Sequence, residues 1–373
     1  MRGYYTPFLF YRRKPSACVA NSLQNVSLFR AALLEFQGGN SNFFNMFTLK
    51  QFYDLCLEMA VKRDPRPKRE VEEMLKERKK DYEKLDEKKK EYFDAESLKN
   101  PYLDSRIMFG DPKTKLGRVM VGIDISVGEI LLANELGKNG KKIDAVFAHH
   151  PEGRALVDLT RVMDVQEDIA VSEGVPVNVA EKMLKVRVGN INRSLHAVNH
   201  YQVPDAARLL NIPFACFHTM ADNQCHWFLK NFITKRKPKY LSDVIDALME
   251  LPEYQEAKRQ GAGPTIFTGD EKSKVGKLSF SGFTGGASGP KEIYEKMSQA
   301  GVGTVLGMHI PEEHRKLAEK YHLNVVICGH MASDSLGYNI LLDEAEKKGT
   351  EIVPCGGLIR VSMAKSRQGW LLA

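Results

Sequence analysis

Two short segments, far apart in the chain, place metal-binding side chains directly after apolar runs. One segment ends in His149 and His150, and the other ends in His330 and Asp334. Continuous Val, Ile and Leu runs are typical of parallel strands that are buried on both faces, and open α/β sheets bind ligands at the carboxyl ends of their strands. Imidazole and carboxylate groups at such ends indicate a metalloprotein of the α/β kind.

Spacing alone does not decide between ligands and structural residues. His330 and Asp334 are four residues apart in a predicted helix, so they share one face and can chelate one ion, although a cap or a surface pair has the same spacing. The adjacent histidines point to opposite sides unless the chain turns before Pro151. Asp222 follows a third apolar run and could equally cap a helix that begins at Asn223. The coincidence of three such strand ends favours a shared site.

Composition limits the class of protein. The chain has 373 residues, 43% of them hydrophobic, and no run approaches the roughly 18 apolar residues that a spanning helix needs. Six cysteines without a CxxC pair indicate a reduced, cytoplasmic protein. More than half of the +7 net charge lies in residues 1–45, so nucleic-acid binding by the rest is not expected.

Residues 1–45 are predicted to be an N-terminal extension, disordered or non-native, with Met46 as the natural start. The segment is rich in Asn, Ser and Gly and has no sustained periodicity, and its Arg content leaves a targeting peptide as an alternative.

From residue 48 the chain alternates between helix and strand patterns, which predicts βαβ units. Predicted strands span 119–125, 143–148, 212–217, 264–268, 277–283, 304–306, 323–328 and 351–354, and predicted helices span 48–61, 127–136, 156–173, 179–186, 204–210, 223–233, 241–250, 253–259, 291–300, 311–321 and 332–347.

Residues 62–100 are dense in charges of both signs, with a narrow apolar stripe at helical spacing. This pattern predicts one long inserted amphipathic helix. It is either an arm that contacts another subunit or a solvated helix that lies on its own domain.

Two further features remain open. The glycine loop Gly285-Gly286-Ala-Ser288-Gly289 precedes a predicted helix, with Ser288 or Gly289 as its cap and Pro290 in its first turn. Its backbone N–H groups could bind a phosphate, or it could be a plain turn. His196 and His200 have helical spacing, and they are either ligands or substrate contacts or a surface or core pair.

At this point the motifs resemble a known family. His149-His150-Pro151 resembles the His-His-Pro motif of the Ngg-interacting-factor-three-like family, the dinuclear-metal-centre proteins also called GTP cyclohydrolase 1 type 2-like. His218-Thr-Met-Ala-Asp222 is similar to the family's His-Thr-Asn-Leu-Asp, and Gly329-His330-Met-Ala-Ser-Asp334 to its Gly-His-x-x-Ser-Glu. The glycine loop and the segment 307–314 match two further motifs in the same order.

The resemblance implies a ligand set for two divalent ions, with Asp222 as the bridge. The implied ligands are His149, His150, Asp222, His330 and Asp334. Such a mixed nitrogen and oxygen set suits zinc, iron, manganese, cobalt or nickel. Asp334 is shorter than the family's Glu, and His309 stands where the family has Glu. His309 and His314 lie outside this ligand set and are candidates for proton transfer.

The implied fold is α/β, with two lobes of mixed or parallel sheets and the metal site at the strand ends between them. The first lobe is expected to comprise 46–235 and 325–373, with 62–100 inserted, and the second 236–324. The resemblance implies a homohexamer and a metal-dependent hydrolase that acts on a nucleotide or another phosphorylated ring compound. The alternative is a non-catalytic adaptor or metal-handling ring protein, and nucleic-acid binding is a weaker third reading.

Overall fold

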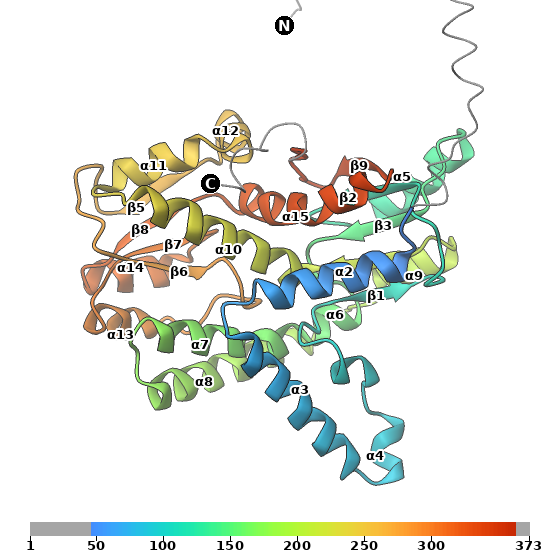
Figure 1. Ribbon diagram of the computed structural model, residues 1–373, viewed down its shortest axis with the longest axis horizontal. Coiled ribbons are helices and arrows are strands. Elements are labelled where there is room, and N and C mark those ends of the chain that lie inside the picture. Colours follow the sequence, from blue (N-terminus) through green and yellow to red (C-terminus); the bar gives the residue numbers. More distant parts are fainter. Residues whose placement is uncertain (1–45, 363–373) are drawn as a thin grey trace, which may run out of the picture. The chain divides into compact units, whose positions relative to one another are not determined.

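The computed structural model describes residues 46–362, so the predicted N-terminal extension lies outside the described residues. A first sheet has the strand order β1-β4-β3-β2-β9, in which β1 is antiparallel to β4 and the other neighbours are parallel (Figure 1). The strands are β1 (Ser105–Phe109), β2 (Arg118–Gly122), β3 (Ala145–Ala148), β4 (Phe214–Phe217) and β9 (Glu351–Cys355). Strands β3 and β4 are buried along their whole length, as their apolar sequences predict.

A second sheet has the order β5-β8-β7-β6, again with one antiparallel edge strand, β5. Its strands are β5 (Thr265–Thr268), β6 (Lys277–Gly282), β7 (Val302–Gly307) and β8 (Asn324–Ile327). The predicted α/β class with mixed sheets in two lobes is therefore confirmed. The second sheet extends to Ile327, however, because β8 pairs with β5 and β7, so the sheet passes the predicted boundary at residue 324.

Two long helices, α10 (His218–Arg236) and α15 (His330–Lys347), pack against each other and join the two sheets. Met220 of α10 and Tyr338 of α15 contribute to the core around the first sheet. Phe228 of α10 and Leu336 of α15 contribute to the core around the second sheet. Because both helices are buried on several faces, they form a shared frame for both lobes.

The remaining helices cover the two sheets. Helix α2 (Leu49–Lys62) begins with a capping box, in which Thr48 and Gln51 satisfy each other's backbone N–H groups, and Phe52 and Cys56 lie on its buried face. The other helices are α5 (Val127–Lys138), α6 (Arg154–Val157), η4 (Leu159–Val162), α7 (Asp164–Ser172), α8 (Val177–Leu195), α9 (Gln202–Leu209), α11 (Leu241–Met249), α12 (Pro252–Arg259), α13 (Ile293–Gln299) and α14 (Glu312–Lys320). The predicted helix 156–173 is thus divided into three short helices.

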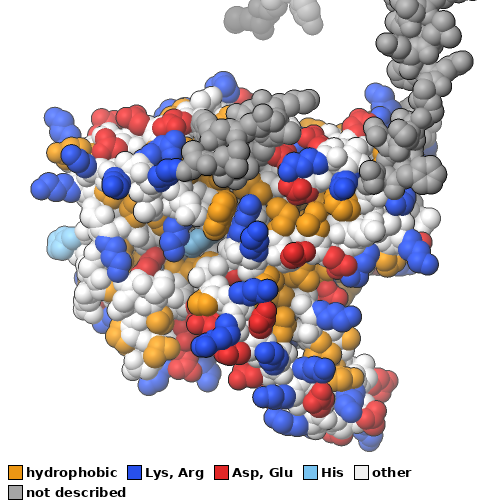
Figure 2. Space-filling model, viewed as in Figure 1, with side chains coloured by type: hydrophobic (Ala, Val, Ile, Leu, Met, Phe, Trp, Pro, Cys, Tyr) orange, Lys and Arg blue, Asp and Glu red, His pale blue; other side chains and the backbone are white. Residues whose placement is uncertain are grey.

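The charged segment 62–100 is not one helix, which corrects the sequence prediction. It forms α3 (Lys68–Glu83), α4 (Glu87–Glu91) and the 3-10 helix η3 (Ala95–Leu98), and α3 and α4 extend beyond the sheets in Figure 1. Asp86 ends the first helical run by capping the second, since its side chain accepts from the Lys89 N–H. Figure 2 shows basic and acidic side chains intermixed on this arm. Such a surface does not favour binding to a polyanion.

Among residues 46–362 no helix is long and apolar enough to cross a membrane.

One buried histidine of α10 leads to a prediction about stability. Burial and the nearby Lys230 lower the pKa of His226 to about 3. The unfolded chain takes up this proton near pH 6.5 while the folded chain does not, so stability falls as the pH drops from 6.5 toward 3, by up to about 1.4 kcal/mol per pH unit. Chemical denaturation at pH 7 and pH 5 should show wild type losing about 2 kcal/mol more than His226→Asn. Equal losses in the two proteins would contradict this assignment.

Candidate metal centre

The predicted ligands come together where strand ends of both sheets meet the first turns of α10 and α15. His149 and His150 follow β3, and their backbone N–H groups donate to Gly122 and Ile123, which keeps the chain in register with β2. His149 is fully buried and His150 is partly exposed. Their ring centroids are 5.2 Å apart, so adjacent side chains reach one site.

Helix α10 begins at His218, five residues earlier than predicted. Asp222 is therefore not a helix cap but lies one turn into the helix. The earlier start places His218 and Asp222 on one face at a spacing of four residues. His218 belongs to a sequence motif but was not predicted as a ligand. Its Nε2 atom lies 3.8 Å from Asp222 Oδ2. The i, i+4 spacing was the signal that could have identified it.

Helix α15 begins at His330, directly after Gly329, and here the predicted spacing holds. Gly329 has a φ of 109°, and a Cβ atom there would lie 2.7 Å from the Ala262 carbonyl oxygen, so glycine is required for the turn. His330 and Asp334 share one helix face, with His330 Nε2 3.4 Å from Asp334 Oδ2.

Asp334 lies at the centre of the cluster. His149 Nε2 is 3.5 Å from Asp334 Oδ1, and His150 Nε2 is 3.5 Å from Asp334 Oδ2. On the other side, His149 Nε2 is 3.4 Å from Asp222 Oδ1. Three groups of donor atoms are close enough to hold a metal ion: His149 with His150 and His218, His150 with His330 and Asp334, and His149 with Asp222 and Asp334.

These separations fit ligands around an ion better than hydrogen bonds. Two donors that each lie roughly 2.1 Å from one ion are about 3.0 to 3.4 Å apart. Among the described residues, both ring nitrogens of His149, Oδ1 of Asp222 and both carboxylate oxygens of Asp334 are buried without a hydrogen-bond partner. Unsatisfied buried polar atoms are costly and rare. Their concentration here shows that these residues fit a metal ion.

The charges of the cluster depend on one another. Burial favours neutral His149, but the carboxylates of Asp334 and Asp222 outweigh burial and raise its pKa to about 10. Burial alone would also raise the pKa of Asp334, yet His149, His150 and His330 hold it far below its ordinary value. The carboxylate of Asp334 is therefore ionised and available to a cation.

Two further aspartates fix the orientation of the histidines. Asp104 Oδ2 accepts from His218 Nδ1 at 2.8 Å and from the Thr219 hydroxyl, and Asp124 Oδ1 accepts from His150 Nδ1 at 2.7 Å. Because a carboxylate only accepts, each histidine carries its proton on Nδ1 and keeps Nε2 free toward the cluster. Neither aspartate was predicted from the sequence.

Asp104→Asn is expected to weaken metal binding about 10- to 100-fold, as is typical when an outer partner of a ligand is lost. Asp124→Asn should cost less, since the Asp124 side chain is 70% exposed whereas that of Asp104 is buried. Competition with a chromogenic chelator gives both affinities. Equal effects of the two substitutions would argue against a distinct role for buried Asp104.

The other predicted residues lie beside the cluster rather than in it. The His309 ring is 4.8 Å from that of His330, and burial lowers the pKa of His309. The His314 Nδ1 atom is 3.3 Å from the Tyr294 hydroxyl, and burial also lowers the pKa of His314.

The glycine loop is not the start of a helix, since α13 begins only at Ile293 with Glu292 as its cap, which corrects the predicted caps Ser288 and Gly289. Gly285 and Gly286 both have positive φ, which suits a turn. Gln166 donates to the carbonyl groups of Gly285 and Ala287 and holds the loop in place.

His196 and His200 do not share a helix, because α8 ends at Leu195. His200 Nε2 lies 2.7 Å from the Leu195 carbonyl oxygen, and neither residue joins a metal-binding group within the described part of the chain. His196 is exposed, so the alternative of a surface residue holds for it.

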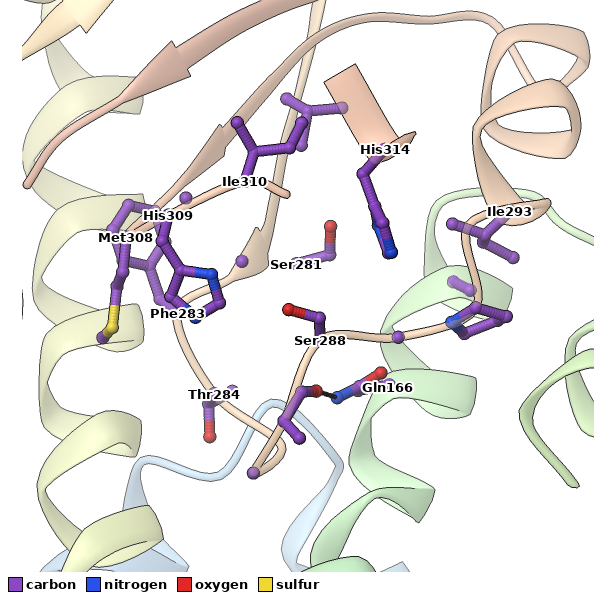
Figure 3. A pocket seen from close by; sticks show the side chains of 18 of the residues that line it. Gln166, Ser281, Phe283, Thr284, Ser288, Ile293, Met308, His309, Ile310 and His314 are labelled. Carbon is purple, nitrogen blue, oxygen red and sulfur yellow. Dashed lines mark hydrogen bonds between the residues drawn. The ribbon is translucent and has the colours of Figure 1, made fainter. Parts of the chain in front are cut away.

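A cavity of ≈ 130 Å³ opens beside the cluster and is lined by Asp222, His330 and Asp334 at one end and by the glycine loop and second sheet elsewhere. In Figure 3, His309 and His314 point into this space, with Ser281 and Ser288 between them. The site thus combines buried ligand groups with room for a small molecule.

A two-lobed α/β fold with buried His/Asp groups at its strand ends defines a class of metal-binding protein. No family model and no curated protein matches the chain. Among solved structures, a NIF3 superfamily protein from Sphaerobacter thermophilus is 30% identical over 70% of this chain and 93% of its own, with a TM-score of 0.62.

Further solved structures match with lower identity. HcgD from Methanocaldococcus jannaschii in its reduced form is 15% identical, with 67% of this chain and 88% of its own covered and a TM-score of 0.41. A Bacillus cereus protein related to NIF3 is 11% identical, with 67% and 90% covered and a TM-score of 0.35. At 30% identity over nearly the whole Sphaerobacter protein, the chain belongs to the NIF3 superfamily, as its motifs predicted.

Proposed function

We propose that this protein is a metal-dependent hydrolase with two divalent ions in the cluster. One observation carries the proposal: Asp334 is the carboxylate common to two of the three donor groups. One ion would be held by His149, His218, Asp222 and Asp334, and the other by His150, His330 and Asp334. Asp334 would then serve both ions, whereas the resemblance implied that role for Asp222.

The donor set suits hydrolytic chemistry. Four imidazoles and two carboxylates suit zinc, iron, manganese, cobalt or nickel. A pair of such ions supplies acidified water and charge stabilisation for an in-line displacement. In the reaction one water is consumed: its oxygen bonds to the electrophilic carbon or phosphorus, the bond to the leaving nitrogen or oxygen breaks, and the leaving atom takes up a proton.

His314 and His309 are the proposed proton carriers. Both rings face the cavity, and their lowered pKa values favour neutral imidazole, which can accept a proton. His314 is the stronger candidate, because it lies away from the ligand histidines and contacts the Tyr294 hydroxyl. The substrate would occupy the cavity. The resemblance implied that it is a nucleotide or another phosphorylated ring compound.

The test is metal analysis of the purified protein followed by assays on nucleotides, cyclic phosphates and cyclic amides. Turnover should require loaded metal and should fall at least about 100-fold in Asp222→Asn and His330→Ala. His196→Ala is the matched control, since it removes an exposed histidine outside the site. Turnover that survives both site substitutions would rule out the hydrolase assignment for this cluster.

A second candidate function is a non-catalytic metal-binding adaptor, assembled as the homohexamer that the resemblance implied. The observation that favours it is His309, whose ring lies 4.8 Å from that of His330 where the family pattern has a glutamate. Two bound ions without turnover on any tested substrate, together with a hexameric mass in solution, would support this reading.

A further inference from the structure

Most of the glycine loop lines the cavity, and neighbouring helices fix its carbonyl groups. From α7, Gln166 Nε2 donates to the carbonyl oxygens of Gly285 at 2.6 Å and of Ala287 at 2.5 Å. From α8, Arg187 Nε donates to the carbonyl oxygen of Ser288 at 2.9 Å. Protein groups therefore occupy these three acceptors and hold the loop in one orientation.

The N–H groups of the same loop are unpaired. Within residues 46–362, no protein group accepts a hydrogen bond from the backbone N–H of any residue from Gly285 to Gly289. Gly285 is buried and the other four residues are half-buried. In turns such as this, with positive φ at Gly285 and Gly286, successive N–H groups form concavities that bind anions. Since buried N–H groups are almost always paired in native proteins, these consecutive unpaired donors suit an anionic ligand.

Ser288 and Arg187 add a hydroxyl group and a positive charge at the loop. In Figure 3 the Ser288 side chain points into the cavity, and its hydroxyl has no partner in the described part of the chain. The Arg187 guanidinium uses only Nε for the loop carbonyl, and neither of its terminal amino groups pairs with another described residue. The planar guanidinium matches the oxygens of a phosphate in geometry and in charge.

The charge of Arg187 acts on the cavity. His314 lines the cavity, and its pKa is lowered first by burial and then by Arg187, which has the largest effect of the charged groups around it. The carboxylates of Glu313 and Glu292 oppose this effect, while Lys291 adds to it. Both carboxylates are exposed and therefore screened by solvent, and Glu313 pairs with Lys291 at 2.6 Å. Arg187 therefore makes this end of the cavity attractive to an anion.

The rest of the lining confines an anion to the loop. Glu167 and Glu173 also line the cavity and would repel an anion that lies farther from Arg187. Unpaired donors and a cation coincide only at the loop among the described lining residues. They suit the three oxygens and the double charge of a phosphate better than the two coplanar oxygens of a carboxylate.

We propose that the glycine loop, Ser288 and Arg187 bind a phosphate group of the substrate at one end of the cavity, while the reacting part of the molecule lies at the cluster. The binding follows from the loop and its neighbours alone. Its use in turnover rests on the proposed hydrolase function.

Calorimetric titration of inorganic phosphate into full-length protein of measured metal content tests the proposal. Arg187→Met removes the charge and should weaken phosphate binding at least about tenfold, because charge-assisted hydrogen bonds are lost. Arg187→Lys keeps the charge but not the planar fork, so its affinity should lie between those of wild type and Arg187→Met. Arg193→Met removes an exposed arginine of the same helix and should bind phosphate as wild type does.

Ser288→Asp tests the loop without changing Arg187. It places a carboxylate where the hydroxyl points into the cavity and should also weaken phosphate binding at least about tenfold, since like charges repel. Unchanged phosphate affinity in both Arg187→Met and Ser288→Asp would overturn the proposal. Loss of binding only in Asp222→Asn and His330→Ala would do so too, because the phosphate would then lie on the metal ions. Acetate that binds wild type as tightly as phosphate would equally contradict a phosphate site.

Failure of this inference is distinguishable from failure of the hydrolase proposal. Phosphate binding that depends on Arg187 and Ser288, in a protein that turns over no substrate, would support the loop site and contradict the hydrolase. Turnover that depends on Asp222 and His330, with phosphate affinity unchanged in Arg187→Met and Ser288→Asp, would support the hydrolase and overturn the loop site.

Discussion

Asp334→Asn is expected to remove most of the bound metal, with an affinity loss larger than the roughly 10- to 100-fold that an outer-shell substitution causes. Asp334 is fully buried, and its two oxygens face three imidazoles at 3.4 to 3.5 Å. The amide keeps the size of the side chain but loses the charge and one of the two acceptor oxygens. Elemental analysis after dialysis against a weak chelator, combined with anomalous scattering from crystals, measures the loss.

Two matched variants test whether this effect is specific. Asp205→Asn changes an exposed aspartate whose side chain pairs with Arg208, and it should keep full metal content. Asp334→Glu keeps the charge and should retain more metal than Asp334→Asn. If Asp334→Asn binds as much metal as wild type, Asp334 is not a ligand and the two-ion assignment fails.

Gly337→Ala is expected to destabilise the fold by about 3 kcal/mol or more, at the upper end of overpacking effects. Helices α10 and α15 lie close together here, since a Cβ atom at Gly337 would lie 2.2 Å from the Ala221 carbonyl oxygen. The two helices must separate to remove this clash, because the clashing atom belongs to the backbone and not to a side chain that can rotate. Asp222 and Asp334 lie within one turn of this contact, so separation should also weaken metal binding.

The matched control is Gly137→Ala in α5, where an added Cβ atom meets nothing within 4 Å. It should stabilise the protein by up to about 1 kcal/mol, since alanine favours a helix interior more than glycine does. Urea denaturation measures both variants. Similar stability of Gly337→Ala and wild type would show that the helices can adjust without cost, and that their close approach does not set the geometry of the cluster.

Local sequence patterns predicted much of the fold. The apolar runs that form β3 and β4 are short and fully buried, as expected for strands with both faces covered. Thr48 caps α2 as predicted. The prediction of one helix over residues 62–100 was wrong, because the helical periodicity of the whole segment concealed a capping residue within it. Asp86 can cap a new helix, and that local hydrogen bond divides the segment.

Only part of the candidate site could be predicted from the sequence. Metal-binding residue types after apolar runs indicated the five predicted ligands. His218 was missed because the boundary of α10 decides whether it shares a face with Asp222, and helix boundaries are set by tertiary contacts as much as by propensity. Asp104 was missed because it has no pattern of its own, and it meets His218 from 114 residues away.

By itself, the sequence determined which residue types stand at the strand ends, the order of the elements, and the family to which the chain belongs. Only the tertiary structure decided that β8 lies in the second sheet while α15, which follows it, packs on α10 beside the first. That crossing makes Asp334 the centre of the cluster and leaves a largely apolar cavity next to it. The physical reason is that local periodicity specifies which face of an element is buried, whereas the partner of that face is chosen by packing between residues distant in the chain.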